Sequence, residues 1–168
     1  MIKKILTLLF LIFFLNTVSY GAGSSAGSGD DDSKIKLGST DERAYKLVKI
    51  ASKHEKRGKL KKAEKNYKKA LGLLLEANKE KPSDPDILNY LGFTSRKLGN
   101  FDNAEIYYLM GLEINPNHNG INEYLGELYL QTNRKDLALE RLEILKVCNC
   151  EEYEQLKDLI NGTKTSKY

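Results

Sequence analysis

Apolar residues recur at helical spacing over most of this 168-residue chain. The first such stripe consists of Ala44, Leu47, Val48 and Ala51. Intervals of three and four positions place side chains on one face of an α-helix, so this stripe predicts an amphipathic helix. A turn at Gly58 separates it from a second stripe, which we expect to form a helix from Leu60 to about Lys79. The pattern predicts helices that pair through their apolar faces.

Polar residues mark where these helices begin. Ser39 and Glu42 have the spacing of a capping box, which predicts a helix start at about Thr40. Asp84 can accept hydrogen bonds from the first backbone amides of a helix, and Pro85 has the fixed φ that suits a first helical position. We therefore expect another helix to open at Pro85.

A stretch of 34 residues, 85–118, recurs further along the chain. Its Leu91, Gly92 and Ala104 reappear as Leu125, Gly126 and Ala138. Glycine lacks a Cβ, so the second helix of each hairpin can approach the first closely at that point. A single hairpin cannot bury its own apolar face, and about three units must stack for stability. More repeat material is therefore expected than two copies.

The period of 34, with Leu-Gly early, Ala in the middle and Pro near the end, resembles the tetratricopeptide repeat, a helix-turn-helix unit. Tyr108 and Pro116 also meet the family pattern, whereas Ser95 stands where Tyr is usual and Gly111 where Ala is usual. In the next unit, Leu142 replaces the aromatic residue. The resemblance implies an all-α fold, a tetratricopeptide-like α-solenoid of about three helix-turn-helix repeats with a C-terminal capping helix.

The residues around Gly58 predict a degenerate first repeat. Gly58, Leu60 and Ala63 precede Gly99, Phe101 and Ala104 by 41 positions, which is one period and seven residues. Seven residues are close to two helical turns, so longer helices keep the same face inward. We expect a repeat domain over residues 40–162, with repeats at about 44–81, 85–118 and 119–149, a capping helix at 151–161 and a frayed tail at 163–168.

The N-terminal segment predicts export. Two lysines precede an eleven-residue segment, from Ile5 to Leu15, that is apolar except for Thr7, and small residues follow. That run is short for a membrane span and suits a signal peptide over residues 1–21, cleaved after Gly21. An uncleaved anchor is the alternative.

Residues 22–39 are rich in Gly, Ser and Asp, which is typical of flexible linkers. Their three consecutive Asp residues lack the spacing of a calcium-binding loop. The expected location is the periplasm or the extracellular medium, in a bacterium.

Cys148 and Cys150 are the candidates for covalent chemistry. A disulfide across one residue is feasible if Asn149 turns the chain, and it would fix the turn before the capping helix. Free or intermolecular thiols are the alternative, with redox catalysis and metal binding less favoured, since His54 and His118 belong to different repeats. The segment Cys-Asn-Cys-Glu-Glu-Tyr also resembles small exported bacterial tetratricopeptide proteins, which more often space the two cysteines further apart.

Charge is divided unevenly. Residues 43–81 hold 14 Lys or Arg against 4 Glu, while residues 82–168 hold 9 basic and 14 acidic residues. A basic first repeat could contact anionic lipid headgroups or an acidic partner, and the alternative is a solvated helix face.

The expected export and the lack of interleaved aromatic and basic residues argue against nucleic acid as a partner. The sequence has no catalytic triad, phosphate loop or metal motif, so we expect neither an enzyme nor a cofactor.

The tetratricopeptide resemblance implies that the first helix of each repeat lines a concave groove. The candidate groove residues are Asp86, Asn89, Tyr90, Phe93, Arg96, Lys97, Glu123, Tyr124, Glu127 and Gln131. This set suits an extended or helical protein segment with an apolar anchor and mixed charge. The alternative for Tyr90 and Tyr124 is a role in contacts between repeats. The double change Phe93→Ala with Arg96→Glu is expected to abolish binding and leave helicity intact.

Overall fold

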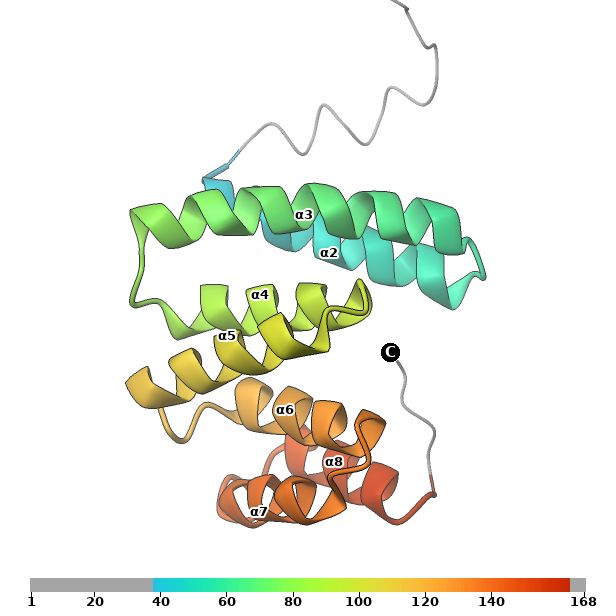
Figure 1. Ribbon diagram of the computed structural model, residues 1–168, viewed down its shortest axis with the longest axis vertical. Helices are drawn as coiled ribbons and strands as arrows, with labels where there is room; N and C mark the ends of the chain where they lie inside the picture. Colours follow the sequence, from blue (N-terminus) through green and yellow to red (C-terminus); the bar gives the residue numbers. More distant parts are fainter. Residues whose placement is uncertain (1–37, 164–168) are drawn as a thin grey trace, which may run out of the picture.

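A computed structural model describes residues 38–163 of the chain. The predicted signal peptide, nearly all of the predicted linker and residues 164–168 lie outside this range. Within it the chain is helical, with no strand, which confirms the all-α prediction (Figure 1). The helices are α2 (Thr40–Lys56), α3 (Leu60–Glu80), α4 (Pro85–Lys97), α5 (Phe101–Ile114), α6 (Asn119–Gln131), α7 (Lys135–Leu145) and α8 (Glu151–Ile160).

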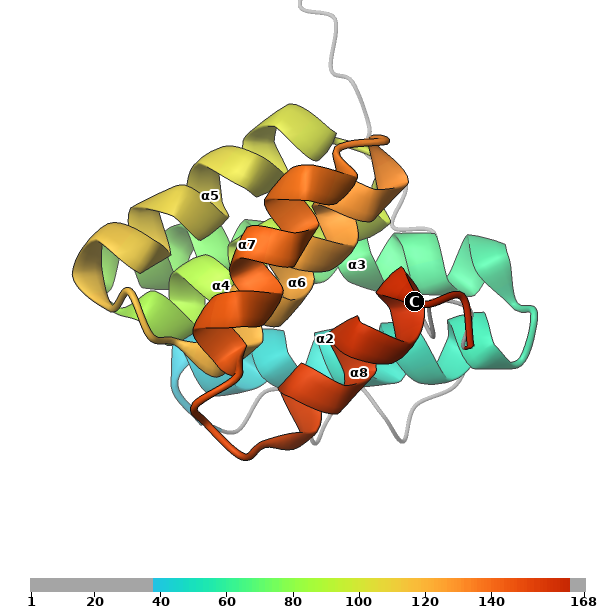
Figure 2. The same cartoon turned by 90° about the horizontal axis from the view of Figure 1, so that it is seen from below.

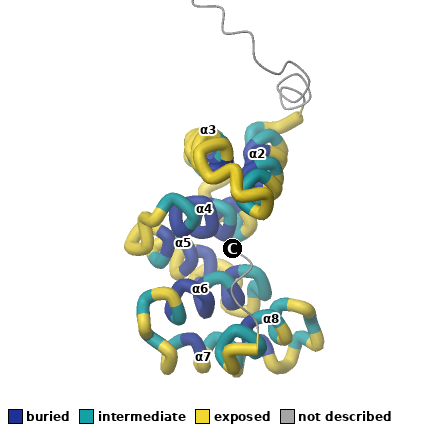
Figure 3. Tube along the Cα trace, turned by 90° about the vertical axis from the view of Figure 1, so that its right-hand side faces the viewer, coloured by how far each residue is buried: buried dark blue, intermediate teal, exposed yellow. Residues whose placement is uncertain are grey.

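The helices form three stacked hairpins, α2 with α3, α4 with α5 and α6 with α7, and α8 packs against both helices of the last hairpin. The first helices α2, α4 and α6 lie along one side of the stack, and the second helices α3, α5 and α7 along the other (Figure 3). Seen from below, α8 lies on the same side as α2, away from α5 and α7 (Figure 2). The result is a solenoid whose two ends, α2 and α8, project beyond α4 and α6.

The helix boundaries follow from local chemistry. The backbone N–H of Ser39 donates to Glu42 Oε2 at 3.3 Å, as the capping-box spacing predicts. Asp84 accepts from the backbone amides of Asp86 and Ile87 at 2.9 and 3.3 Å, and α4 opens at Pro85. Gly58 turns the chain between α2 and α3 with a φ of 69°, a conformation that glycine adopts without strain.

The first hairpin is longer than the second. Its helices α2 and α3 have 17 and 21 residues, against 13 and 14 for α4 and α5. In Figure 1 the turn between α2 and α3 extends beyond the C-terminal end of α4. The extra residues of the first repeat thus lengthen this hairpin, so that its turn overhangs the end of α4. The apolar faces of α2 and α3 still point into the core.

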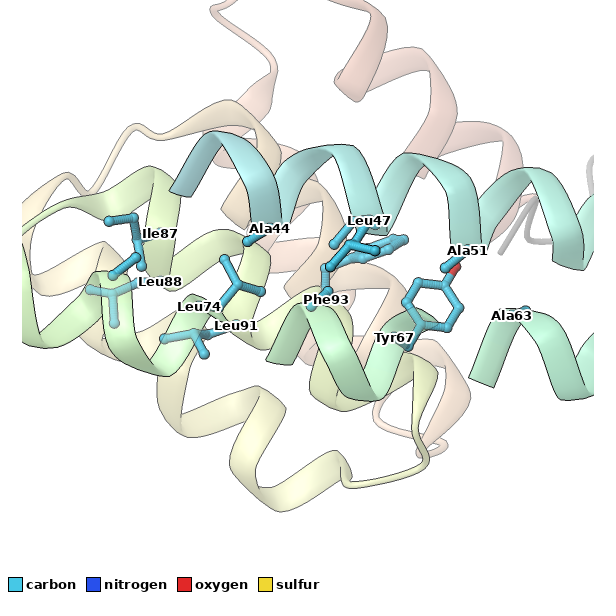
Figure 4. Close-up of a cluster of buried hydrophobic side chains, with 13 residues drawn as sticks. Ala44, Leu47, Ala51, Ala63, Tyr67, Leu74, Ile87, Leu88, Leu91 and Phe93 are labelled. Atoms are coloured by element: carbon cyan, nitrogen blue, oxygen red, sulfur yellow. The ribbon is translucent and has the colours of Figure 1, made fainter. Parts of the chain in front are cut away.

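The core follows the apolar stripes. Leu47 and Ala51 of α2 face Tyr67 and Leu74 of α3, and Leu91 of α4 continues the same cluster (Figure 4). A Cβ at Gly92 would overlap the ring of buried Tyr108 on α5, so the predicted close approach within a hairpin is confirmed there.

The role expected for the second glycine is wrong in detail. A Cβ at Gly126 would overlap Leu156 of α8, not a side chain of α7. The capping helix therefore packs directly onto the Leu-Gly position of the last repeat. Leu156 is fully buried by this contact.

Candidate functional site

A groove with a volume of about 600 Å³ opens between the first repeat and the helices α4 and α6. One wall comes from α2, and the floor comes from side chains of α4 and α6. The residues that line it are Val48, Lys49, Ser52, Lys53, Lys56, Arg57, Asn89, Tyr90, Phe93 and Tyr124. Four of the ten predicted groove residues are therefore brought together here.

Aromatic rings form the floor and also join the repeats. The ring of Phe93 contacts that of Tyr124 on the next repeat, with centroids 5.1 Å apart, and meets Tyr67 of the first repeat edge to face at 6.2 Å. Tyr90 stacks on Tyr45 of α2 at 4.1 Å. Tyr90 and Tyr124 thus combine both expected roles, because they pack between repeats and line the groove. Such a floor is rigid and suits an apolar anchor.

The basic wall was missed by the sequence interpretation. Lys49, Lys53 and Lys56 line the groove from α2, and Arg57 lines it from the position that follows the helix. The candidate groove residues all come from the first helices of the second and third repeats. The rule that first helices face the groove, applied to residues 40–56 as well, would have indicated lysines at helical spacing on the groove side of α2.

Arg96 and Glu127 do not face the groove, which corrects the prediction. The guanidinium of Arg96 donates from Nη1 to Glu127 Oε2 at 2.8 Å, and the two side chains are 1% and 2% exposed. Arg96 also lies 5.7 Å from the ring centroids of both Phe93 and Tyr124. The ion pair lies between adjacent first helices, beneath the aromatic floor, where a ligand cannot reach it.

Two further candidates also lie elsewhere. The Lys97 ammonium contacts Glu55 Oε1 at 2.5 Å, which ties α4 to the end of α2, and Lys97 lines a separate hollow between the first two repeats. Gln131 is exposed at the last position of α6 and lines none of the hollows described here. Neither side chain contributes to the groove.

A second hollow of about 490 Å³ continues the groove toward α8. It shares Asn89, Tyr90 and Tyr124 with the first, and its acidic lining comes from three helices: Asp86 of α4, Glu123 of α6 and Glu152 of α8. The hollow also includes His118, whose Nε2 lies 3.1 Å from Asp86 Oδ1. Its lining therefore carries the opposite charge to the α2 wall.

Glu123 is the most perturbed carboxyl group of this hollow. It is 3% exposed, and burial raises its pKa to about 8, with nearby Glu127 and Glu152 adding to the shift and Arg96 opposing it. The group is thus largely protonated at neutral pH. Glu123, predicted as a groove residue, does not line the groove beside α2, and its nearly buried side chain lines this adjoining hollow instead.

Cys148 and Cys150 form a disulfide in the structure, with Cα atoms 5.2 Å apart. Asn149 between them has a φ of 49°, a left-handed conformation that asparagine tolerates, and it turns the chain into α8. Cys150 is the residue that precedes the first turn of α8.

Within residues 38–163 there is no cluster of three or more side chains placed to hold a metal ion. Nor does a helix of this range have the length and apolar character to cross a membrane.

Comparison with known proteins identifies one repeat by its sequence. The family model for the tetratricopeptide repeat matches residues 85–118, the interval set by the internal period. No curated protein matches the chain.

Solved structures with a similar fold include a type III secretion chaperone and a protein in complex with a chaperone-binding region. The Yersinia enterocolitica type III secretion chaperone SycD, in complex with a peptide of the translocator YopD, is 18% identical, with a TM-score of 0.52 over 72% of this chain and 88% of that chain. PcrH in complex with the chaperone-binding region of PopD is 16% identical, with a TM-score of 0.52 over 76% of this chain and 91% of that chain. At these identities the likeness establishes the tetratricopeptide-like helical fold.

Proposed function

We propose that this chain is a non-enzymatic binding module that holds a segment of a partner protein in the groove between α2, α4 and α6. The observation that carries the proposal is the groove itself. A rigid aromatic floor of Tyr90, Phe93 and Tyr124 faces a wall of flexible basic side chains. Such a surface offers an apolar anchor site beside charges that fix orientation, which is how extended or helical peptides are recognised.

The structural neighbours support a peptide ligand. SycD was solved with a peptide of YopD, and PcrH with the chaperone-binding region of PopD. We extend that kind of ligand to this chain because the fold is shared and the groove is open. The partner segment would carry an apolar side chain over the half-buried rings of Tyr90 and Tyr124, which flank the nearly buried Phe93. It would carry acidic residues opposite Lys49 and Lys53. No cofactor takes part in the proposed function.

Site-specific photocrosslinking tests the proposal. Lys53→p-benzoylphenylalanine places a crosslinker in the groove, and Lys65→p-benzoylphenylalanine is the matched control on the exposed face of α3. Each variant is irradiated in a lysate of the source cells, and crosslinked peptides are sequenced by mass spectrometry. We expect position 53, and not position 65, to capture one defined segment, and a synthetic copy of it to bind the purified chain. Equal capture at both positions would contradict the groove as the binding site.

We further propose that the protein works after export, in the periplasm or outside the cell, on the basis of the signal-like residues 1–21. An alternative role is an accessory in the assembly of envelope complexes, docked on anionic membrane or an acidic partner through the first repeat. The observation in its favour is a row of exposed lysines on α3, Lys61, Lys62, Lys65 and Lys69.

Liposome flotation separates the two roles. Binding to anionic vesicles that is lost at high salt, and lost again when the four α3 lysines are changed to glutamine, would favour membrane docking. Absence of binding at low salt would remove that alternative. If a crosslinked partner depends on these four lysines and not on the groove, its site is the basic repeat.

A further inference from the structure

The acidic hollow beside the groove contains buried hydrogen-bond acceptors that have no partner. Among the described residues, neither Asn89 Oδ1 nor Glu123 Oε1 accepts a hydrogen bond, although both atoms are buried. Asn89 is 9% exposed and Glu123 is 3% exposed, and both residues line the hollow. Buried acceptors without donors cost free energy, so two of them at one hollow indicate a ligand that supplies donors.

The surrounding groups specify the charge of that ligand. Asp86 and Glu152 add carboxylates to the lining. His118 offsets them little, because its Nδ1 accepts the backbone N–H of Ile121, which leaves the Nε2 proton to be donated to Asp86. The rings of Tyr90 and Tyr124 border the same space, and aromatic faces attract cations. Acceptors, carboxylates and aromatic faces together favour a cation with several N–H groups.

We propose that this hollow binds the ammonium or guanidinium group of a lysine or arginine side chain in the partner segment. The inference rests on the proposed function, because the hollow and the groove share Asn89, Tyr90 and Tyr124 and one peptide can occupy both. A metal ion is not the occupant we infer, since residues 38–163 contain no metal-binding cluster.

This site gives the groove a direction. The peptide would place acidic residues along the α2 wall, an apolar residue on the aromatic floor, and a basic residue in the hollow toward α8. Charge complementarity of this kind fixes register and discriminates between partners. A peptide of the same composition in the reverse order would match neither end.

NMR titration of the purified chain tests the hollow directly, with N-acetyl-lysine methylamide as the probe and N-acetyl-norleucine methylamide as its uncharged control. We expect saturable shifts of the Asn89 side-chain amide and the Gly120 backbone amide with the lysine probe only. At pH 9, where Glu123 with its pKa of about 8 is ionised and the lysine ammonium is still charged, Glu123→Gln should weaken binding of the lysine probe about tenfold, as expected for the loss of one charge-assisted hydrogen bond. The matched variant Glu113→Gln, at an exposed position of α5, should leave binding unchanged.

Equal shifts with the norleucine probe would overturn the proposal and make the hollow an apolar subsite. Unchanged binding of the lysine probe to Glu123→Gln would overturn it as well. The peptide recovered by crosslinking separates this inference from the function on which it rests. Replacement of its lysine or arginine by norleucine should reduce affinity about tenfold. If affinity is unaffected while the crosslink at position 53 persists, the cation site is wrong and the groove function stands.

Discussion

The guanidinium of Arg96 and the carboxylate of Glu127 meet at 2.8 Å across two neighbouring repeats, each nearly removed from solvent. They lie 31 positions apart in sequence, one repeat less about one helical turn. Two charges buried in this way are costly to desolvate, and their mutual attraction offsets that cost only while both are present. The pair therefore links α4 to α6 specifically, because neither charge is tolerated alone.

Removal of one member of this pair should be strongly destabilising. We expect Arg96→Met to lower the free energy of unfolding by about 3–5 kcal/mol, because Glu127 would be left buried without its partner. The double variant Arg96→Met with Glu127→Leu should recover most of the loss. Urea denaturation followed by circular dichroism measures both, and a loss below about 1 kcal/mol in the single variant would contradict the burial of the pair.

The double change Phe93→Ala with Arg96→Glu does not serve as a binding test. It would place a new carboxylate against Glu127 and Glu123 in a buried site, so we expect unfolding and not selective loss of binding. Lys53→Glu and Lys56→Glu are suitable replacements, since both residues line the groove and both are exposed.

Two glycines in helices should respond in opposite ways to the same substitution. Gly92→Ala places a Cβ against the buried Tyr108 ring, and overpacking of this kind costs roughly 1–3 kcal/mol. Gly72→Ala on α3 meets no atom within 4 Å and should stabilise the chain by roughly 0.5–1 kcal/mol through helix propensity. Gly126→Leu, which would displace Leu156 and α8, should cost at least as much as Gly92→Ala. Thermal melting should give the highest melting temperature for Gly72→Ala, a lower one for Gly92→Ala and the lowest for Gly126→Leu.

The stability of the protein should depend on the protonation of Glu123. Its pKa is about 8 in the folded chain, above the ordinary value of 4.5, so the folded state holds a proton that the unfolded state has released. The stability contributed by this proton is complete below about pH 4.5, falls as the pH rises, and is lost above about pH 8. Glu123→Gln should remove this dependence.

The comparison is made by urea denaturation of wild type and Glu123→Gln at pH 5, 7 and 9. The variant should gain on the wild type by up to about 1.4 kcal/mol per pH unit within this window. The same charged and titratable groups surround position 123 in both proteins, so their contributions cancel in the difference. These groups are Arg96, Glu127, Glu151, Glu152, Asp86 and His118. A constant difference from pH 5 to pH 9 would contradict the raised pKa.

The cysteine pair should be oxidised in the protein recovered from its source cells. We expect neither Cys148 nor Cys150 to react with iodoacetamide until the protein is reduced, and both to react afterwards, as read by intact mass. Reduction should lower the melting temperature only slightly, because the closed loop is very short. Alkylation of both residues without prior reduction would show free thiols.

Processing of the N-terminus gives a separate prediction about residues outside the described range. The mature chain recovered from the source cells should begin near Ala22, after removal of residues 1–21. N-terminal sequencing by mass spectrometry is the measurement. An intact Met1 in the membrane fraction would instead identify the segment as a retained anchor.

The helices, their pairing and the stack could be predicted because each depends on local periodicity and on one repeated interval. The burial of Arg96 and Glu127 could not be predicted in this way. A side chain on a first helix can face the hairpin partner, an adjacent repeat or the groove. Leu91 and Gly92 identify only the first of these. Opposite charges at an interval of 31 would have indicated the second, since a shift of one turn brings such positions together on adjacent first helices.

The overhanging turn of the first hairpin has a consequence for the speed of binding. It extends past α4 at one side of the groove and carries Lys56, Arg57, Lys59, Lys61 and Lys62, all exposed. A projecting cluster of positive charge accelerates diffusional encounter with an acidic segment, whereas the aromatic floor governs how slowly that segment leaves. Added salt should therefore slow association of an acidic partner far more than it hastens dissociation.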